Sequence, residues 1–255
     1  HEAKAVVTDF WAMIFNPSSI DRLVLVILGC WIAGAFFVLS VASYYLLKKR
    51  HEKEALFMGK ISLLVAFIVL FLQLISGDSS AKLVAKYLPA KLAAMEGIYT
   101  TKEYTPISII GYVDAKNQKV YSLKIPGMLS FLTYGDFQKA IPGLDQVPKE
   151  EWPNVPLVFQ FYHIMVGCWF LMFFIALLGV FHWKRKTLTE ARRFLWVAVF
   201  SVVLPQIALQ TGWFTAEMGR QPWIIYGVLK TAQGVSKEIT PQQVFGSITM
   251  FVMIY

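Results

Sequence analysis

Residues 212–223 read Gly-Trp-Phe-Thr-Ala-Glu-Met-Gly-Arg-Gln-Pro-Trp and lie at the end of a long apolar run. The stretch places a carboxylate, Glu217, and a guanidinium, Arg220, close to two indoles. Acidic and basic side chains are costly next to hydrocarbon, so membrane segments that carry them usually use them. The stretch therefore predicts membrane helices arranged around this corner.

The composition of the whole chain also favours a membrane protein. Of its 255 residues, 56% are hydrophobic and 16% are charged, whereas soluble domains are about a quarter charged. Much of the net charge of +8 lies in two short clusters beside apolar runs. Basic residues in that position set membrane topology, so we expect no nucleic-acid partner.

Four apolar runs are long enough to cross a bilayer. Their approximate bounds are 20–47, 55–75, 157–181 and 194–217. Basic residues at 48–53 and 182–193 follow the first and third runs. Because basic connections stay in the cytoplasm, residues 78–156 are predicted to form a long extracytoplasmic loop.

The expected fold class is an all-α membrane protein, a transmembrane helix bundle with a structured extracytoplasmic loop. Its parts are an interfacial segment with two transmembrane helices (1–77), the loop region (78–156), two further helices (157–218), and a motif loop with a truncated fifth helix (219–255). Residues 105–125 alternate around a turn-like stretch and predict a small hairpin. The last residue, Tyr255, lies inside an apolar run, so we expect a fragment of a longer protein.

The fourth run carries polar residues at a spacing of four, three and four, namely Gln206, Gln210, Trp213 and Glu217. At 3.6 residues per turn they share one helix face, which is predicted to point into the bundle. The stripe either lines a site for a cofactor, proton or ligand, or is a helix-packing seam in which Glu217 pairs with Arg220. Pro205, in the same run, predicts a kink.

The third run places Gln160, His163 and Gly167 on one face and Met165 on another. A single Met on a membrane helix more often packs than binds a metal, whereas a buried imidazole needs a partner.

In the loop, Lys91 and Glu96 lie within Pro89-Ala-Lys-Leu-Ala-Ala-Met-Glu-Gly97. From the pattern alone, an exposed interfacial helix with ion pairing is the simplest interpretation.

Four stretches together resemble subunit I of the cytochrome bd ubiquinol and menaquinol oxidases. They are the signature at 212–223, the Lys-Leu-Ala-Ala-Met-Glu-Gly start of a quinol-binding loop at 91–97, the Ile-Met-Val-Gly of a Met-bearing helix at 164–167, and the Thr-Asp-Phe-Trp and Phe-Asn-Pro of a helix entry at 8–17. The chain is identified by this resemblance as the C-terminal part of such a subunit.

The resemblance implies a multi-pass protein of the bacterial or archaeal plasma (inner) membrane, surrounded by lipid. Such a subunit carries three haems: a low-spin haem b, and a high-spin pair of haem b with haem d or b. It oxidises quinol at the outer face and reduces dioxygen to water, together with a second oxidase subunit and small accessory subunits.

The resemblance also implies roles for particular residues. Glu217 becomes the catalytic ligand of a high-spin haem iron, and Met165 an axial ligand of the low-spin haem iron. Lys91 and Glu96 serve quinol binding and oxidation. The remaining cofactor-binding residues are Arg220, Gln221 and Trp213 at the high-spin site, and His163, where many family members have an arginine that suits a haem propionate.

The chain departs from the family in three ways. Leu25 stands where the histidine ligand of the low-spin haem is expected, Leu88 replaces a frequent glutamine, and the first four helices of the family are absent. An alternative is therefore a degenerate paralogue without the low-spin haem, acting as a quinol-binding or structural partner subunit. A transporter whose polar stripe lines a substrate path is a third hypothesis, which the resemblance disfavours.

Overall fold

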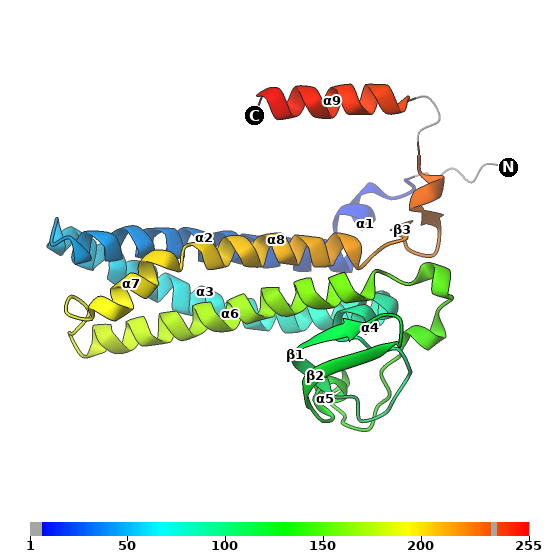
Figure 1. Ribbon diagram of the computed structural model, residues 1–255, viewed down its shortest axis with the longest axis horizontal. Helices are drawn as coiled ribbons and strands as arrows, with labels where there is room; N and C mark the ends of the chain where they lie inside the picture. The colour runs from blue at the N-terminus through cyan, green and yellow to red at the C-terminus, as the bar shows by residue number, and fades with distance from the viewer. Residues whose placement is uncertain (1–6, 236–238, 255) are drawn as a thin grey trace.

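The computed structural model describes residues 7–235 and 239–254, and long helices lying side by side form most of it (Figure 1). Its α-helices are α1 (Phe10–Ile14), α2 (Pro17–Leu47), α3 (Glu52–Tyr87), α4 (Pro89–Glu96), α5 (Met128–Tyr134), α6 (Val155–Lys184), α7 (Arg192–Phe200), α8 (Val203–Met218) and α9 (Pro241–Ile254). Its strands are β1 (Ile107–Asp114), β2 (Lys119–Ile125), β3 (Trp223–Ile225) and β4 (Leu229–Lys230). Short 3-10 turns are η1 (Leu144–Gln146), η2 (Lys149–Glu151) and η3 (Thr231–Gln233). The first six residues of the predicted interfacial segment, and Tyr255, lie outside the described residues.

The predicted number of membrane spans is confirmed within the described part of the chain. The stretches long and apolar enough to cross a bilayer are Ser18–Leu47, Glu52–Tyr87, Lys149–Lys184 and Arg192–Met218. The second helix differs from the prediction, because α3 continues past residue 75 to Tyr87. Residues 78–87, which the prediction placed in the structured loop region, therefore continue this helix.

The fourth span is broken near Pro205, as predicted. It consists of α7 and α8, which meet at Ser201 and Val202. Proline has no N–H to donate to the carbonyl four residues earlier, so the helix is interrupted about one turn before it. The Ser40 hydroxyl of α2 donates a hydrogen bond of 2.7 Å to the Val199 carbonyl beside the break. The break therefore leaves this carbonyl satisfied by a neighbouring helix.

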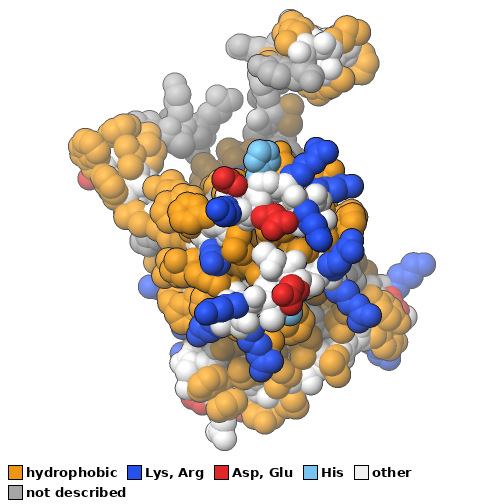
Figure 2. All heavy atoms as spheres, turned by 90° about the vertical axis from the view of Figure 1, so that its left-hand side faces the viewer, with side chains coloured by type: hydrophobic (Ala, Val, Ile, Leu, Met, Phe, Trp, Pro, Cys, Tyr) orange, Lys and Arg blue, Asp and Glu red, His pale blue; other side chains and the backbone are white. Residues whose placement is uncertain are grey.

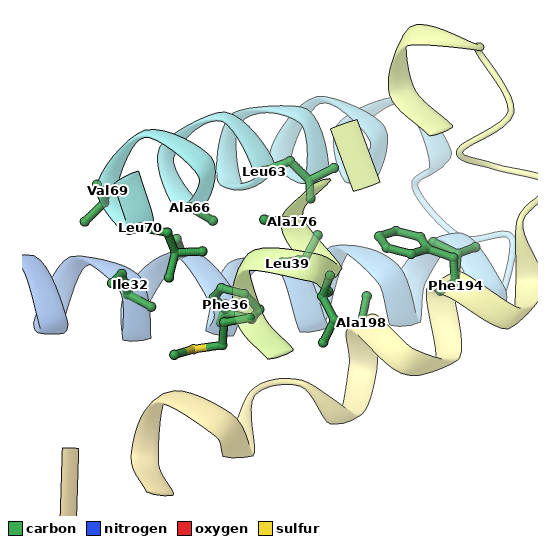
Figure 3. Packing of buried hydrophobic residues seen from close by; sticks show 14 of the residues in the cluster. Ile32, Phe36, Leu39, Leu63, Ala66, Val69, Leu70, Ala176, Phe194 and Ala198 are labelled. Atoms are coloured by element: carbon green, nitrogen blue, oxygen red, sulfur yellow. The ribbon is translucent and has the colours of Figure 1, made fainter. Parts of the chain in front are cut away.

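The main core lies between α2, α3, α6 and α7 (Figure 3). Its fully buried side chains include Phe36 and Leu39 of α2, Leu63 and Leu70 of α3, and Leu195 of α7. Small residues of α6, such as Ala176, allow that helix to approach the others closely. The apolar faces on the outside of the bundle are suited to lipid or to further helices.

A glycine on α6 provides a test of this packing. A Cβ added at Gly179 would lie 2.3 Å from Leu63 Cδ2 and 2.9 Å from Phe194 Cζ. We expect Gly179→Ala to lower the free energy of unfolding by about 1–3 kcal/mol, as overpacking of a close-packed core does. Thermal unfolding in a membrane mimetic measures the effect. Gly34→Ala on α2 is the control, since its Cβ would meet nothing within 4 Å; equal loss in both variants would contradict the contact-based explanation.

The two ends of the bundle differ in character. The connections α2–α3 and α6–α7 lie at one end, whereas α4, α5 and the β1–β2 hairpin pack at the other (Figure 1). β1 and β2 pair antiparallel, with Asp114 opposite Lys119 across the turn, so the predicted hairpin is confirmed. A second core of buried residues, from Ala85 to Val158, holds α4 and the loop together. Helix α9 lies apart from the bundle and buries none of its residues.

Candidate functional site

Helix α4 forms the centre of the loop region. Its start at Pro89 and its end at Gly97, which has a φ of +69°, follow the usual preference for proline in the first turn and glycine after the last. Every residue from Ala90 to Glu96 is buried. The expectation of an exposed interfacial helix is therefore wrong, because α4 packs against both α3 and α6.

Lys91 and Glu96 point to different parts of the protein. Five residues along an α-helix correspond to a rotation of about 140°, so the two side chains cannot share a face. Within residues 7–235 and 239–254, Lys91 and Glu96 do not form an ion pair with each other, and neither belongs to any other ion pair. The ion pairing expected from the pattern is thus absent, and each group has its own environment.

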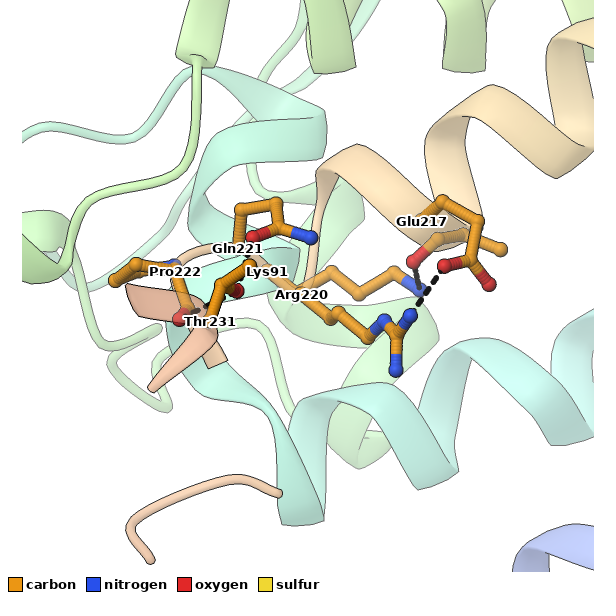
Figure 4. Close-up of polar contacts among 7 residues, drawn as sticks. Lys91, Glu217, Arg220, Gln221, Pro222 and Thr231 are labelled. Carbon is orange, nitrogen blue, oxygen red and sulfur yellow. Dashed lines mark hydrogen bonds and ion pairs between the residues drawn. The ribbon is translucent and has the colours of Figure 1, made fainter. Parts of the chain in front are cut away.

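Lys91 reaches across to the end of α8 (Figure 4). Its Nζ donates a hydrogen bond of 3.3 Å to the Ala216 carbonyl. Gly219 makes room for it, since a Cβ there would lie 3.0 Å from Lys91 Cγ. Burial lowers the pKa of Lys91 to about 8; the positive charge of Arg22 lowers it further, while the carboxylate of Glu217 opposes the shift. The ammonium group therefore loses its proton more easily than an ordinary lysine.

Glu217 and Arg220 form an ion pair at the same corner. Arg220 Nη2 lies 2.5 Å from Glu217 Oε2, and both side chains are about two-fifths exposed (Figure 4). The Nε of Arg220 is buried and has no partner among the described residues. The ion pair predicted for a packing seam is therefore present, and one donor of the guanidinium remains available to a further acceptor.

The polar stripe on α8 faces away from the other helices of the described chain, so these helices do not provide the bundle interior into which it was predicted to point. Gln206 and Gln210 are exposed, and Trp213 is 60% exposed. The buried residues of α8 are instead Pro205, Thr211 and Thr215. Both threonine hydroxyls donate to carbonyls of their own helix, so these side chains pack as if apolar.

The motif loop after α8 is fixed by its own contacts. The Thr231 hydroxyl donates to Gln221 Oε1 at 2.7 Å and contacts the Pro222 carbonyl at 3.0 Å (Figure 4). Lys230 Nζ lies 2.9 Å from a carboxylate oxygen of Glu151, and this ion pair joins β4 to η2. Gln221 is thus held within the loop, and the loop is tied to the segment that leads into α6.

Glu96 is enclosed between α4, the hairpin and α6. It is 4% exposed, and the Ser108 N–H donates to its Oε2 at 3.3 Å. Burial raises the pKa of Glu96 to about 7, although hydrogen bonds from Ser108 and the Tyr162 hydroxyl oppose the shift. Sequence analysis did not select Tyr162, because nothing in the residue pattern links it to a glutamate so far away along the chain. Glu96 can therefore hold or release a proton near neutral pH.

The polar face of α6 binds the hairpin. His163 Nδ1 lies 2.8 Å from the Phe159 carbonyl and Nε2 lies 3.0 Å from the Ser108 carbonyl. Gln160 donates from Nε2 to the Gly111 carbonyl at 2.8 Å. Both side chains thus anchor β1 on the helix.

Met165 faces α8. A Cβ added at Gly212 would lie 2.9 Å from the Met165 sulfur, so the thioether occupies the contact between the two helices. Leu25 of α2 is partly buried and supplies no ligand atom. Within the described ranges the histidines other than His163 are His51 and His182, beside the basic connections at the other end of the bundle.

These features define a class: a multi-pass helical membrane protein whose loop helix carries a buried lysine and a buried glutamate against the end of a membrane helix. The chain belongs to the cytochrome bd terminal oxidase subunit I family, whose model matches residues 1–255. The family suggested by the four sequence stretches is thereby confirmed. With its bacterial relatives and four apolar helices, the chain is part of a multi-pass plasma-membrane protein.

Individual relatives agree with this assignment. The Bacillus subtilis protein named "Putative cytochrome bd menaquinol oxidase subunit I" is 34% identical over 236 residues, covering 89% of this chain and 53% of that protein. Cytochrome bd ubiquinol oxidase subunit 1 of Bacillus subtilis is 30% identical over 263 residues, covering 99% and 56%. The structure of bd oxidase from Geobacillus thermodenitrificans matches with a TM-score of 0.85 at 28% identity, covering 97% of this chain and 56% of that chain. The chain thus spans little more than half the length of these relatives.

Proposed function

We propose that the protein containing this chain is subunit I of a bd-type quinol:dioxygen oxidoreductase, which works with a second subunit and small accessory subunits. The observation that carries the proposal is the corner between α4 and α8. There Lys91 bonds to the carbonyl of Ala216, directly before Glu217. The residue expected to bind quinol is thus joined to the helix end that bears the expected haem ligand.

On the quinol side, the chain supplies two groups with complementary properties. The Lys91 ammonium is suited to donate a hydrogen bond to a quinol oxygen. Glu96 Oε2 is suited to take a proton as quinol is oxidised, because its pKa of about 7 places it near the working pH. Before it takes up the proton, the carboxylate form that acts as the base is stabilised by the Ser108 N–H and the Tyr162 hydroxyl. We place this loop outside the cell, since the basic connections lie at the other end of the bundle.

On the oxygen side, we propose that Glu217 holds the iron of a high-spin haem. The residues fit such a group: a carboxylate lies on the outward face of α8, beside an arginine whose buried Nε still has no described acceptor. A haem propionate would supply that acceptor. Trp213 and Gln221 would flank the group from the same face and from the following loop. When bound, the high-spin pair, haem b with haem d or b, supplies the chemistry of dioxygen binding and reduction.

The low-spin haem fits less well. Met165 offers a thioether, but Leu25 offers nothing, and both ring nitrogens of His163 already contact carbonyls. The described residues therefore do not supply a Met/His pair for haem b. This observation favours the second candidate function, a paralogue without the low-spin haem that binds quinol or supports another subunit.

The full-length protein, purified with its partner subunit, separates the two functions. For an oxidase we expect quinol-dependent dioxygen consumption together with high-spin haem absorption. Quinol binding without dioxygen consumption would instead establish the paralogue. A low-spin haem b spectrum that disappears in Met165→Ala would refute the paralogue and require a ligand other than residue 25.

A further inference from the structure

A hollow lies at the end of the bundle opposite α4. It has a volume of about 450 Å³ and opens between the first turns of α3 and the connection from α6 to α7. Figure 2 views this end of the molecule, where many lysine and arginine side chains gather, with some acidic side chains among them. The hollow is remote from the α4–α8 corner, so neither quinol nor haem chemistry accounts for it.

The lining of the hollow has a cationic half and an apolar half, and Thr189 completes it. Its cationic half consists of Lys60, Lys184 and Lys186. Its apolar half consists of Leu56, Trp183 and Leu188. Leu188 is 3% exposed and belongs to the main core, so the apolar floor is fixed in place. A ligand that fills the hollow needs an anionic head and an adjoining apolar part.

The lysines of the hollow have no anionic partner in the described part of the chain. The ion pairs there involve Lys82, Arg220 and Lys230. Lys60 lies roughly two turns into α3, about 12 Å from its first residue at 1.5 Å per residue, inside a stretch that is apolar enough to span the membrane. A lysine at that depth is costly unless a counter-charge meets it.

The connection that carries Lys186 has a defined shape. Lys186 has a φ of +59°, in the left-handed region that a lysine rarely adopts. The turn is held by the Thr187 N–H, which donates to the His182 carbonyl at 3.0 Å, and by a 3.0 Å contact between His182 Nδ1 and the Thr187 hydroxyl. These contacts define the turn that carries Lys186.

An apolar path leads from the hollow into the membrane. Leu56, Lys60 and Leu64 are spaced four residues apart and therefore share one face of α3. Leu64 is 47% exposed. An acyl chain can follow this face toward the bilayer centre while the head group stays among the lysines. Trp183 stands at the helix end, where an indole suits the interface between head groups and hydrocarbon.

We propose that this hollow is a binding site for one anionic phospholipid, whose phosphate is held by Lys60, Lys184 and Lys186. The opposite charges of lysines and phosphate, together with the apolar floor, favour a lipid over free phosphate, which would leave that floor uncovered. Basic pockets between membrane helices are a known physical solution for anionic head groups.

Lipid retention by the full-length protein, purified with its partner subunit, tests the site. The measurement is native mass spectrometry after detergent extraction, followed by titration with phosphatidylglycerol. We expect the variant with Lys60→Gln, Lys184→Gln and Lys186→Gln to lose one retained phosphatidylglycerol and to bind it at least about tenfold more weakly. The matched control replaces Lys49, Arg50 and Lys53, which lie at the same end but outside the hollow, by glutamine. It is expected to retain the lipid.

Additional variants and ligands complete the test of the lipid site. Lys60→Gln alone, compared with Lys60→Arg, covers the case in which the triple variant unfolds: Lys60→Gln is expected to bind phosphatidylglycerol more weakly and Lys60→Arg, which keeps the charge, to retain it, and equal retention by these two variants would overturn the proposal. Equal retention in the triple variant and the parent would overturn the proposal. So would equal retention of phosphatidylcholine, which would indicate non-specific lipid, or equal binding of inorganic phosphate, which would indicate a free-anion site.

Discussion

Glu96→Gln is expected to lower quinol-dependent dioxygen consumption about 100-fold, which is the low end of the contribution that a positioned acid or base makes. Glutamine preserves the shape of the side chain and can still accept from the Ser108 N–H, but it cannot take up a proton. Steady-state oxygen consumption by the full-length complex measures the effect. Glu103→Gln, an exposed carboxylate in the same loop, is the control and should leave the rate unchanged.

The pH profile gives this prediction a second readout. With a pKa of about 7, Glu96 is neutral below that pH and can act as a base only above it. The rate should therefore rise as the pH passes through about 7 from below. Lys91, with a pKa of about 8, loses its ammonium proton above that pH, so the rate should fall again. Glu96→Gln should abolish the acidic limb alone; an unchanged limb would assign it to another group.

Glu217→Ala is expected to remove one high-spin haem from the spectrum and to lower dioxygen reduction by about 100-fold or more, since a lost or mispositioned ligand weakens a metal site at least that much. Unfolding is a poor alternative explanation. The Glu217–Arg220 pair is about two-fifths exposed, and exposed pairs contribute only about 1 kcal/mol or less. Absorption spectroscopy with oxygen consumption tests the two effects together.

A second ion pair provides the matched control for Glu217→Ala. Asp78 and Lys82 on α3 lie 2.5 Å apart and are similarly exposed. Asp78→Ala should therefore cost comparable stability while leaving the haem spectrum intact. If both variants lose haem equally, or if Glu217→Ala keeps the full high-spin signal, the proposed ligand role of Glu217 fails.

The membrane scaffold could be predicted from sequence because length and hydrophobicity determine it. Four apolar runs of this length are most stable inside a bilayer, so the four spans could be predicted. Pro205 removes a specific backbone hydrogen-bond donor, so the break in the fourth span could be predicted as well. The hairpin followed from alternation over 105–125. The full length of the helix that contains the second span was not predicted, because polar residues follow residue 75, although the helix continues to Tyr87.

The environment of the candidate site could not be predicted in the same way. A short helix with a lysine and a glutamate has the composition of a surface helix, and only the packing around Ala93 and Ala94, both fully buried, shows that it lies inside. The face of α8 that meets the other described helices was not predicted, for a related reason. Threonines that bond to their own backbone can face a bundle, which leaves the more polar glutamines outside.

The way α4 is enclosed bears on how the protein would survive a cut in its loop. The hairpin turn at 114–118 is largely exposed, as a protease site must be. Helix α4 and strand β1 precede this turn, whereas α6 follows it. Both α4 and β1 pack against α6. A chain cleaved at the turn would therefore remain one assembled body, with Lys91 and Glu96 still in place although no longer joined to α6 by an unbroken backbone.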